Sequence, residues 1–239
     1  MKILITNDDG ACASQLVPLI KWCRRLGDVT VVVPKFEQSG KSHSIEIHNP
    51  FEIKQVELEP GITVWTVDST PADCVRFAVS GLKQTYDLAI SGINRGYNLG
   101  YDVMYSGTFA AASEAVNKGM RAVALSTSIK YYDRAVEHLE EIFRFLEGNC
   151  LFDRNPLYNI NIPVDPRGIR LTRQGGLSFR EEFIPIGNNM YEPGGKPLHA
   201  EGTDPTLDAD ACKQGYISVT PMATTRMNTT VYEELKNLL

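Results

Sequence analysis

Apolar runs that alternate with helical patterns constrain the fold of this chain more than any other feature. Strands are predicted at residues 2–6, 29–34, 62–67, 88–90 and 122–127. Amphipathic spacing predicts helices at 15–26, from 71 onward, at about 109–118 and at 131–148. Continuous apolar strands are typical of a parallel sheet that is buried on both faces. We therefore expect an α/β fold, a mostly parallel sheet covered by helices on both faces.

The pattern changes after about residue 150. Further strands are predicted at 157–163, 169–175 and 216–221, and turn-forming residues at 177–200 predict an extended hairpin or loop. The tail at 228–239 has a Thr230-to-Glu233 capping-box spacing and ends as a short amphipathic helix. So short a helix needs a packing partner, which together with the extension indicates at least a dimer. We expect one domain over 1–239, in which 1–150 form the core with the site loops and 151–239 complete it and supply an oligomerisation extension.

Composition narrows the classes of function that are open to the chain. A net charge of -5 argues against binding a nucleic-acid duplex through a broad basic face. No apolar run approaches the length of a membrane span, and the N-terminal residues do not resemble a signal peptide. The five cysteines are scattered and lack a zinc-type spacing, which suits a reducing compartment. These features predict a soluble, cytoplasmic protein without a membrane partner.

The first predicted strand runs directly into the sequence Asn7-Asp8-Asp9-Gly10. Two adjacent carboxylates repel each other, so this stretch is either a solvated turn or a site for a cation. Its place favours a site, because ligands of parallel α/β sheets bind beyond the carboxyl ends of the strands. The adjacent pair differs from the haloacid-dehalogenase pattern, which separates two aspartates by one residue. The chain also lacks the GxxxxGK[ST] pattern of a phosphate-binding loop.

Two more polar loops follow strands of the predicted sheet. The first carries Ser39, which offers a hydroxyl, and Gly40, which permits a close approach of the backbone to a ligand. The second, residues 91–115, supplies the amide oxygen of Asn94 and leads through Ser106-Gly107-Thr108 into an alanine-rich helix. The unpaired N–H groups and the macrodipole at a helix start favour a phosphate or another oxyanion. Capping of this helix by a hydroxyl side chain is compatible with that role.

Together the three loops offer oxygen atoms from two carboxylates, a hydroxyl and an amide, at Asp8, Asp9, Ser39 and Asn94. An all-oxygen set selects Mg²⁺, Mn²⁺ or Ca²⁺ rather than zinc or copper. A divalent cation that faces a helix start is a credible site for phosphoryl chemistry. The cation would polarise the phosphoryl oxygens and lower the pKa of a bound water, while helix amides would take up negative charge. It would also relieve the repulsion between the two carboxylates.

Several spaced motifs resemble the survival protein E (SurE) nucleotidases. They are NDDG at 7–10, the VVVP-to-SG run that ends at Gly40, TPADCV at 70–75, the SGIN-to-SGT stretch at 91–108, GTD at 202–204 and SVTP at 218–221. The resemblance implies a three-layer α/β/α, Rossmann-like core and a metal-dependent phosphatase of nucleoside monophosphates. It also implies subunits that associate through C-terminal extensions, as a homodimer or a homotetramer.

The resemblance assigns roles to positions that match the family motifs. Asp8, Asp9, Ser39 and Asn94 match the metal ligands. The matching phosphate-binding positions are Ser106, Gly107 and Thr108, and we add Asn7 and Gly40 as candidates. The expected cofactor is one divalent cation per subunit, Mg²⁺ or Mn²⁺.

The expected reaction is hydrolysis of nucleoside 5′-monophosphates, with 3′-monophosphates as an additional candidate substrate. A metal-associated water would attack phosphorus, with Asp8 or Asp9 as the general base. Direct attack by one aspartate, which would give an aspartyl-phosphate, is also open. The alternatives from other classes are a nucleotide-binding sensor without turnover and a metal-dependent transferase.

Some neighbouring residues have two interpretations. His43 could bind or protonate a leaving group, or it could be structural. Lys41 and Arg95 could contact phosphate or be solvated. Three aromatic residues could stack on a base or pack within their own loop, and they are Tyr97, Tyr101 and Tyr105.

Overall fold

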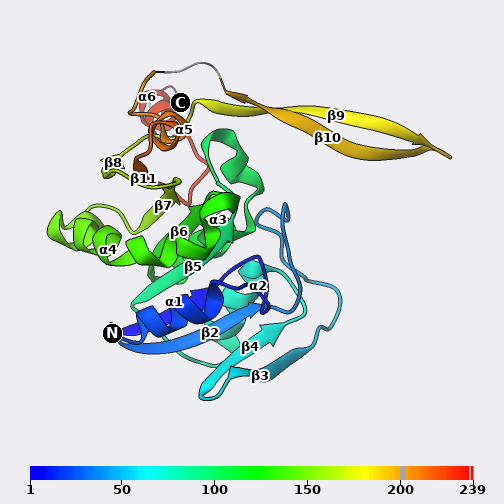
Figure 1. The fold of residues 1–239 in the computed structure, drawn as a ribbon, viewed down its shortest axis with the longest axis vertical. Coiled ribbons are helices and arrows are strands. Elements are labelled where there is room, and N and C mark those ends of the chain that lie inside the picture. Colours follow the sequence, from blue (N-terminus) through cyan, green and yellow to red (C-terminus); the bar gives the residue numbers. More distant parts are fainter. Residues whose placement is uncertain (200–202, 237, 239) are drawn as a thin grey trace.

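Figure 1 shows a computed structural model that describes residues 1–199, 203–236 and 238. In this part of the chain one sheet has nine strands, in the order β3-β4-β2-β1-β5-β6-β7-β11-β8. The bounds are β1 (Lys2–Thr6), β2 (Asp28–Pro34), β3 (Ile53–Glu59), β4 (Ile62–Val67), β5 (Leu88–Arg95), β6 (Arg121–Thr127), β7 (Leu157–Ile162), β8 (Ile169–Leu171) and β11 (Ile217–Pro221). Six neighbouring strands are parallel to one another, in the order β4, β2, β1, β5, β6 and β7. Strand β3 runs antiparallel to β4, and β11 runs antiparallel to β7. The mostly parallel sheet predicted from the sequence is confirmed.

Two layers of helices cover the two faces of the sheet. The helices are α1 (Leu16–Cys23), α2 (Pro71–Arg76), α3 (Gly107–Asn117) and α4 (Leu139–Gly148). Successive side chains of a strand point to opposite faces. Ile3 and Ile5 of β1 accordingly pack with residues of α1 and α4, whereas Leu4 packs with residues of α2 and α3. Burial on both faces explains why the strand is apolar from Ile3 to Ile5, and the three-layer prediction is confirmed.

The sheet brings the three predicted site loops to one edge. Strands β2, β1 and β5 are neighbours and run parallel, so their carboxyl ends lie together. The loop with Ser39 follows β2, the turn with Asp8 and Asp9 follows β1, and Asn94 lies at the end of β5. This arrangement is the usual ligand-binding edge of a parallel α/β sheet.

Three local predictions were wrong or incomplete. Strand β3 was not predicted, because this edge strand has mixed burial and no continuous apolar run. The helix predicted at 131–148 begins as a 3₁₀ segment over Ile129–His138 and becomes α-helical only in α4. The two helix types place side chains at similar spacing over a few residues, so an amphipathic pattern does not separate them. The strand predicted at 169–175 ends at Leu171, before a turn at Gly175 and Gly176.

The predicted hairpin is present as β9 (Leu177–Gly187) and β10 (Met190–His199), which project from the rest of the chain (Figure 1). Its turn uses Asn188 and Asn189 at φ of 52° and 56°, a left-handed conformation that asparagine tolerates. Ala200 of the predicted hairpin and Gly202 of the GTD motif lie outside the described residues, as do 237 and 239 of the tail.

The terminal helix α6 spans Thr229–Leu235. Its cap is Asn228, whose Oδ1 accepts a hydrogen bond from the backbone N–H of Val231 at 3.1 Å. The predicted capping role of Thr230 is therefore wrong. Among the helices of the described residues, none combines the length and the apolar character that a membrane crossing requires.

Buried asparagines of β7 hold the glycine-rich loop 96–105 in place. The side-chain amides of Asn159 and Asn161 both donate to the backbone carbonyl of Asn98, at 2.9 and 3.0 Å. The backbone N–H of Asn98 donates in return to Asn161 Oδ1 at 2.9 Å. Groups in the second half of the chain thus fix a loop of the first half.

Asp208, at the start of α5 (Asp208–Lys213), also fastens this loop. Its buried carboxylate accepts hydrogen bonds from the backbone N–H groups of Gly100 and Gly175, both at 3.0 Å, and of Ala209 at 2.8 Å. The carboxylate therefore joins the glycine-rich loop to the segment that follows β8.

We predict that Asp208→Asn lowers the free energy of unfolding by about 1–3 kcal/mol, because the new amide N–H₂ would face donors and leave one unpaired. Urea unfolding measures the change. Asp28→Asn, at an exposed aspartate whose side chain forms no hydrogen bond or ion pair with a residue that the structure describes, is the control and should stay close to the wild type. Equal stability of Asp208→Asn and the wild type would contradict the fastening role.

Candidate metal and phosphate site

Asn7 shapes the acidic turn that follows β1. Its side-chain N–H₂ donates to the carbonyl of Gly10 at 2.9 Å, and the N–H of Gly10 donates to Asn7 Oδ1 at 3.0 Å. These two bonds close the turn and hold Asp8 and Asp9 at the end of the strand. Asn7 is buried and does not line the pocket described below. In this structure Asn7 therefore shapes the turn, and the phosphate contact predicted for it stays a prediction.

The carboxylate of Asp8 lies against the first turn of α3. The backbone N–H of Thr108 donates to Asp8 Oδ2 at 3.1 Å, and the Thr108 hydroxyl donates to Oδ1. This close approach requires glycine at position 107, where a Cβ would lie 2.9 Å from the Cβ of Asp8. The helix start stabilises the carboxylate through its N–H groups and its macrodipole. Thr108 thus donates two hydrogen bonds to Asp8, and its role in binding phosphate stays a prediction.

Ser106 and Gly107 retain groups that an anion could use. The hydroxyl oxygen of Ser106 caps α3 by accepting from the N–H of Phe109 at 3.0 Å, as predicted. The N–H of Ala110 bonds to the Ser106 carbonyl at 3.1 Å. In the described part of the chain, no acceptor meets the N–H of Gly107. An anion at the helix start would therefore meet the Ser106 hydroxyl and this free N–H group.

The other three predicted metal ligands carry oxygen atoms that are only partly engaged. Asp9 Oδ2 accepts from the backbone N–H of Arg95 at 3.1 Å. The Ser39 hydroxyl donates to a carboxylate oxygen of Glu37 at 2.7 Å, which leaves its lone pairs free. The amide N–H₂ of Asn94 donates to a backbone carbonyl two residues later, at 2.9 Å. Its amide oxygen has no hydrogen-bond partner within the described ranges.

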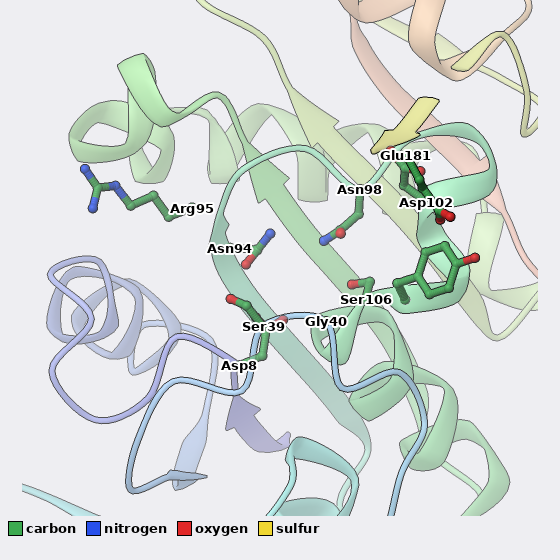
Figure 2. Close-up of a pocket in the computed structure, with 10 residues that line it drawn as sticks. Asp8, Ser39, Gly40, Asn94, Arg95, Asn98, Asp102, Ser106 and Glu181 are labelled. Atoms are coloured by element: carbon green, nitrogen blue, oxygen red, sulfur yellow. The ribbon is translucent and has the colours of Figure 1, made fainter. Parts of the chain in front are cut away.

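A pocket of about 300 Å³ brings most of these residues together. Five of the predicted positions line it, namely Asp8, Ser39, Gly40, Asn94 and Ser106. Figure 2 shows Asn94 and Ser39 close together on one side of the pocket, with Asp8 beneath them and Ser106 next to them. Asp9 and Ser39 also line a neighbouring pocket of about 760 Å³. The four predicted cation ligands therefore surround the junction of two pockets.

Three lining residues were not predicted from the sequence, and they are Asn98, Asp102 and Glu181. Glu181 comes from β9, so the projecting hairpin contributes to the pocket at its base. A conspicuous carboxylate inside the glycine-rich motif, Asp102, was a signal available in the sequence. No local signal placed Glu181, because its position depends on how the hairpin leaves the core.

Of the residues with two interpretations, some line the pocket and others do not. Tyr105 and Arg95 line the pocket, and the guanidinium of Arg95 points away from Ser106 (Figure 2). His43 instead lies within hydrogen-bond distance of Glu114 of α3, with 3.1 Å between Nε2 and Oε2. The remaining candidates, Lys41, Tyr97 and Tyr101, do not line this pocket.

The acidic turn holds two neighbouring carboxylates, and the charge of Arg95 compensates that of Asp9 only in part. Burial raises the pKa of Asp8 above its usual value, and burial together with repulsion from Asp8 raises the pKa of Asp9 to about 6. Among the described residues, no lysine, arginine or histidine forms an ion pair with either carboxylate. A cation would supply the missing compensation.

The donor atoms fit a hard divalent cation. Two carboxylates, an amide oxygen and a hydroxyl match the oxygen ligands that Mg²⁺ and Mn²⁺ take in proteins. Over the described ranges, no three side chains of His, Cys, Asp or Glu cluster in a way that could hold a metal. The set at the acidic turn therefore differs from a nitrogen- and sulfur-rich zinc site.

The fold and the site define an α/β protein with an oxygen-rich pocket beside the start of a helix. The family model of Survival protein SurE matches residues 3–181. The chain belongs to the SurE family.

Similar proteins match along almost the whole chain. A protein of Desulforudis audaxviator described as 5′-nucleotidase SurE is 38% identical over 251 residues, which cover 100% of this chain and 96% of that protein. A protein of Legionella pneumophila described as 5′-nucleotidase SurE is 37% identical, and the match covers 100% of this chain and 97% of that protein. The crystal structure of the SurE protein from Aquifex aeolicus superposes with a TM-score of 0.81 at 28% identity, and covers 100% of this chain and 99% of that one. The fold predicted from the sequence motifs is therefore shared with a solved member of the family.

The raised pKa of Asp9 predicts that Asp9→Asn stabilises the metal-free protein. Between the usual value of 3.8 and about 6, the unfolded chain releases this proton while the folded chain retains it. The stability of the wild type consequently falls as pH rises through this window. In EDTA, we expect the variant to exceed the wild type by about 1–2 kcal/mol at pH 8, after allowing for solvent screening.

Urea unfolding in EDTA at pH 5 and pH 8 measures this difference. The advantage of the variant should be smaller at pH 5 than at pH 8, and it should level off above about pH 6. The asparagine oxygen can still accept the bond from the N–H of Arg95. A variant that is less stable than the wild type at pH 8 in EDTA would show that Asp9 is not electrostatically strained.

Proposed function

We propose that the protein is a metal-dependent nucleotidase, a phosphomonoesterase that hydrolyses nucleoside 5′-monophosphates and, as an additional candidate substrate, 3′-monophosphates. The observation that carries this proposal is the oxygen-donor set beside the free donors at the start of α3. The relatives described as 5′-nucleotidase SurE, which align over nearly their full length, support the same reaction.

We assign Asp8, Asp9, Ser39 and Asn94 as ligands of one divalent cation per subunit, Mg²⁺ or Mn²⁺. A phosphate in the pocket would face the Asp8 carboxylate, and the only basic residue of the lining, Arg95, points away from the helix start (Figure 2). Without a cation, negative charge would meet negative charge. When bound, the cation polarises the phosphoryl group and activates a water for attack on phosphorus.

The chain's own residues would bind and orient the phosphate. Ser106 and the free N–H of Gly107 donate to its oxygens, and Gly40 brings backbone close to the same pocket. Thr108 occupies both carboxylate oxygens of Asp8, whereas Asp9 is bonded at only one oxygen. We therefore assign the general base, which takes a proton from the attacking water, to Asp9.

We further propose that the protein assembles as a homodimer or homotetramer through the hairpin β9–β10 and α6. The hairpin exposes apolar side chains that a monomer would leave in water, with 69% of Phe183, 48% of Ile184 and 58% of Ile186 accessible. A second copy of the chain is the partner we assign to this surface.

The five cysteines are free thiols, which supports a cytoplasmic location. We regard residues 1–239 as a single domain, because groups after residue 150 fasten the site loops.

The first test is phosphate release from AMP, GMP and a 3′-monophosphate in Mn²⁺, in Mg²⁺ and in EDTA. We expect metal-dependent release, and we expect Asp9→Asn to lower kcat/KM by at least about 100-fold. The matched control is Asp133→Asn, at a carboxylate that lines the neighbouring pocket outside the proposed ligand set and should remain active. Full activity in EDTA would refute the metal-dependent mechanism. Release that requires an added acceptor, or nucleotide binding without release, would favour a transferase or a sensor.

A second prediction concerns Gly107→Ala. The added Cβ would come within 2.9 Å of the Asp8 side chain and displace this ligand. Affinity for Mn²⁺, measured by calorimetry, should fall by about tenfold or more. Gly148→Ala, at the end of α4 where a Cβ meets open space, is the control and should bind Mn²⁺ as the wild type does. Unchanged affinity in Gly107→Ala would argue against Asp8 as a ligand.

A further inference from the structure

Asp102 is a carboxylate of the pocket for which neither the cation site nor the phosphate contacts provide a role. It lies in the 3₁₀ segment Gly100–Tyr105 and is partly buried. Its side chain forms no hydrogen bond or ion pair with any residue that the structure describes. Figure 2 places it together with Glu181 on the opposite side of Ser106 from Asn94. A carboxyl group without a partner, facing a pocket, is available to a ligand.

The segment that carries Asp102 is held at several points. At its start, the carbonyl of Gly100 accepts a hydrogen bond from Gln174 at 2.6 Å, in addition to the bond that Asp208 accepts from the Gly100 N–H. At its end, the hydroxyl of Ser42 donates to the carbonyl of Met104 at 2.7 Å, and the Ser42 N–H donates to the next carbonyl at 3.0 Å. The backbone of Asp102 is therefore fixed while its side chain is unengaged, which is the arrangement expected of a preorganised catalytic group.

The residues that line the pocket follow one another in an order that puts Asp102 at the side away from the proposed cation ligands. The proposed cation ligands Ser39 and Asn94 lie at one side, the phosphate donor Ser106 follows, and Asp102 lies beyond it (Figure 2). In an in-line displacement the leaving oxygen lies on the far side of phosphorus from the attacking water. A phosphate oriented by the cation and the helix start would direct its ester oxygen toward Asp102.

We infer that Asp102 is the general acid that protonates the leaving alcohol oxygen of the substrate, an inference that rests on the proposed function. The bond from the water oxygen to phosphorus forms while the bond from phosphorus to the ester oxygen breaks. The electron pair of the broken bond stays on the ester oxygen, which takes the proton of the Asp102 carboxyl and leaves as an alcohol. The proton lost by the water passes to Asp9 and then to solvent, and Asp102 regains a proton from solvent.

The surroundings of Asp102 suit this role better than those of its neighbours. Burial raises the pKa of Asp102 above its usual value, which increases its protonated fraction near neutral pH. Glu181 is exposed to solvent, whereas Asp102 is partly buried. The hydroxyl groups of Tyr105 and Ser106 are much weaker acids than a carboxyl group. His43 pairs with Glu114 and does not line the pocket.

The test is the dependence of Asp102→Asn on the leaving group. A nucleoside or glycerol alkoxide needs a proton to leave, whereas p-nitrophenolate leaves without one. We expect the variant to lower kcat/KM for AMP and for glycerol phosphate by about 10²–10⁴-fold and for p-nitrophenyl phosphate by less than about tenfold. Affinity for Mn²⁺, measured by calorimetry, should be unchanged, because Asp102 lies outside the proposed ligand set. Glu181→Gln is the matched control and should show no dependence on the leaving group.

Each other outcome has a definite meaning. Equal losses with alkyl and aryl esters, or no loss with either, would overturn the assignment, and a leaving-group-dependent loss in Glu181→Gln would transfer the role to that residue. If the wild type hydrolyses glycerol phosphate but no nucleotide, the nucleotidase proposal fails while glycerol phosphate and p-nitrophenyl phosphate still decide the role of Asp102. If the folded, Mn²⁺-loaded wild type hydrolyses no ester, both proposals are refuted.

Discussion

The hydrogen bonds between Asp8 and Thr108 are the constraint on which the rest of the site depends. They join the end of β1 to the start of α3, across 100 residues of sequence. The carboxylate takes the place at the helix N-terminus that an external anion would otherwise occupy. A phosphate would therefore meet the Ser106 hydroxyl, the Gly107 N–H and the proposed cation. The proposed anion site and the proposed cation site would thus share one boundary, which is the Asp8 side chain.

The sequence indicates which residues meet, because parallel strands bring their carboxyl ends to one edge. Asp8 and Ser39 follow buried strands and Asn94 lies at the end of one, and the structure places all three around one pocket. The sequence does not show which polar atoms are already engaged. Asn7 and Thr108 were assigned to phosphate, yet their polar groups hold Gly10 and Asp8. Such assignments depend on side-chain geometry, which residue type and spacing alone do not determine.

Other parts of the site depend on contacts that are distant along the chain. Asn159 and Asn161 sit in a buried strand, where an unpaired amide would be costly, so their presence was a signal that a partner lies nearby. The identity of that partner, Asn98, required the fold. Asp208 gave no comparable signal, because a short acidic stretch before a helix is common as an N-terminal cap. Glu181 reaches the pocket only because the hairpin leaves the core beside the Gly100–Tyr105 segment.

The fastening of the glycine-rich loop has a consequence for the order in which the protein is made. All four proposed cation ligands lie before residue 96 and leave the ribosome early. The amide of Asn159 that holds Asn98 follows 61 residues after it, and the carboxylate of Asp208 that holds Gly100 follows 108 residues after it. A nascent chain that ends before Asp208 carries the proposed ligands but lacks one of the groups that fasten the loop beside them. The full set of these bonds can therefore form only after Asp208 has been synthesised.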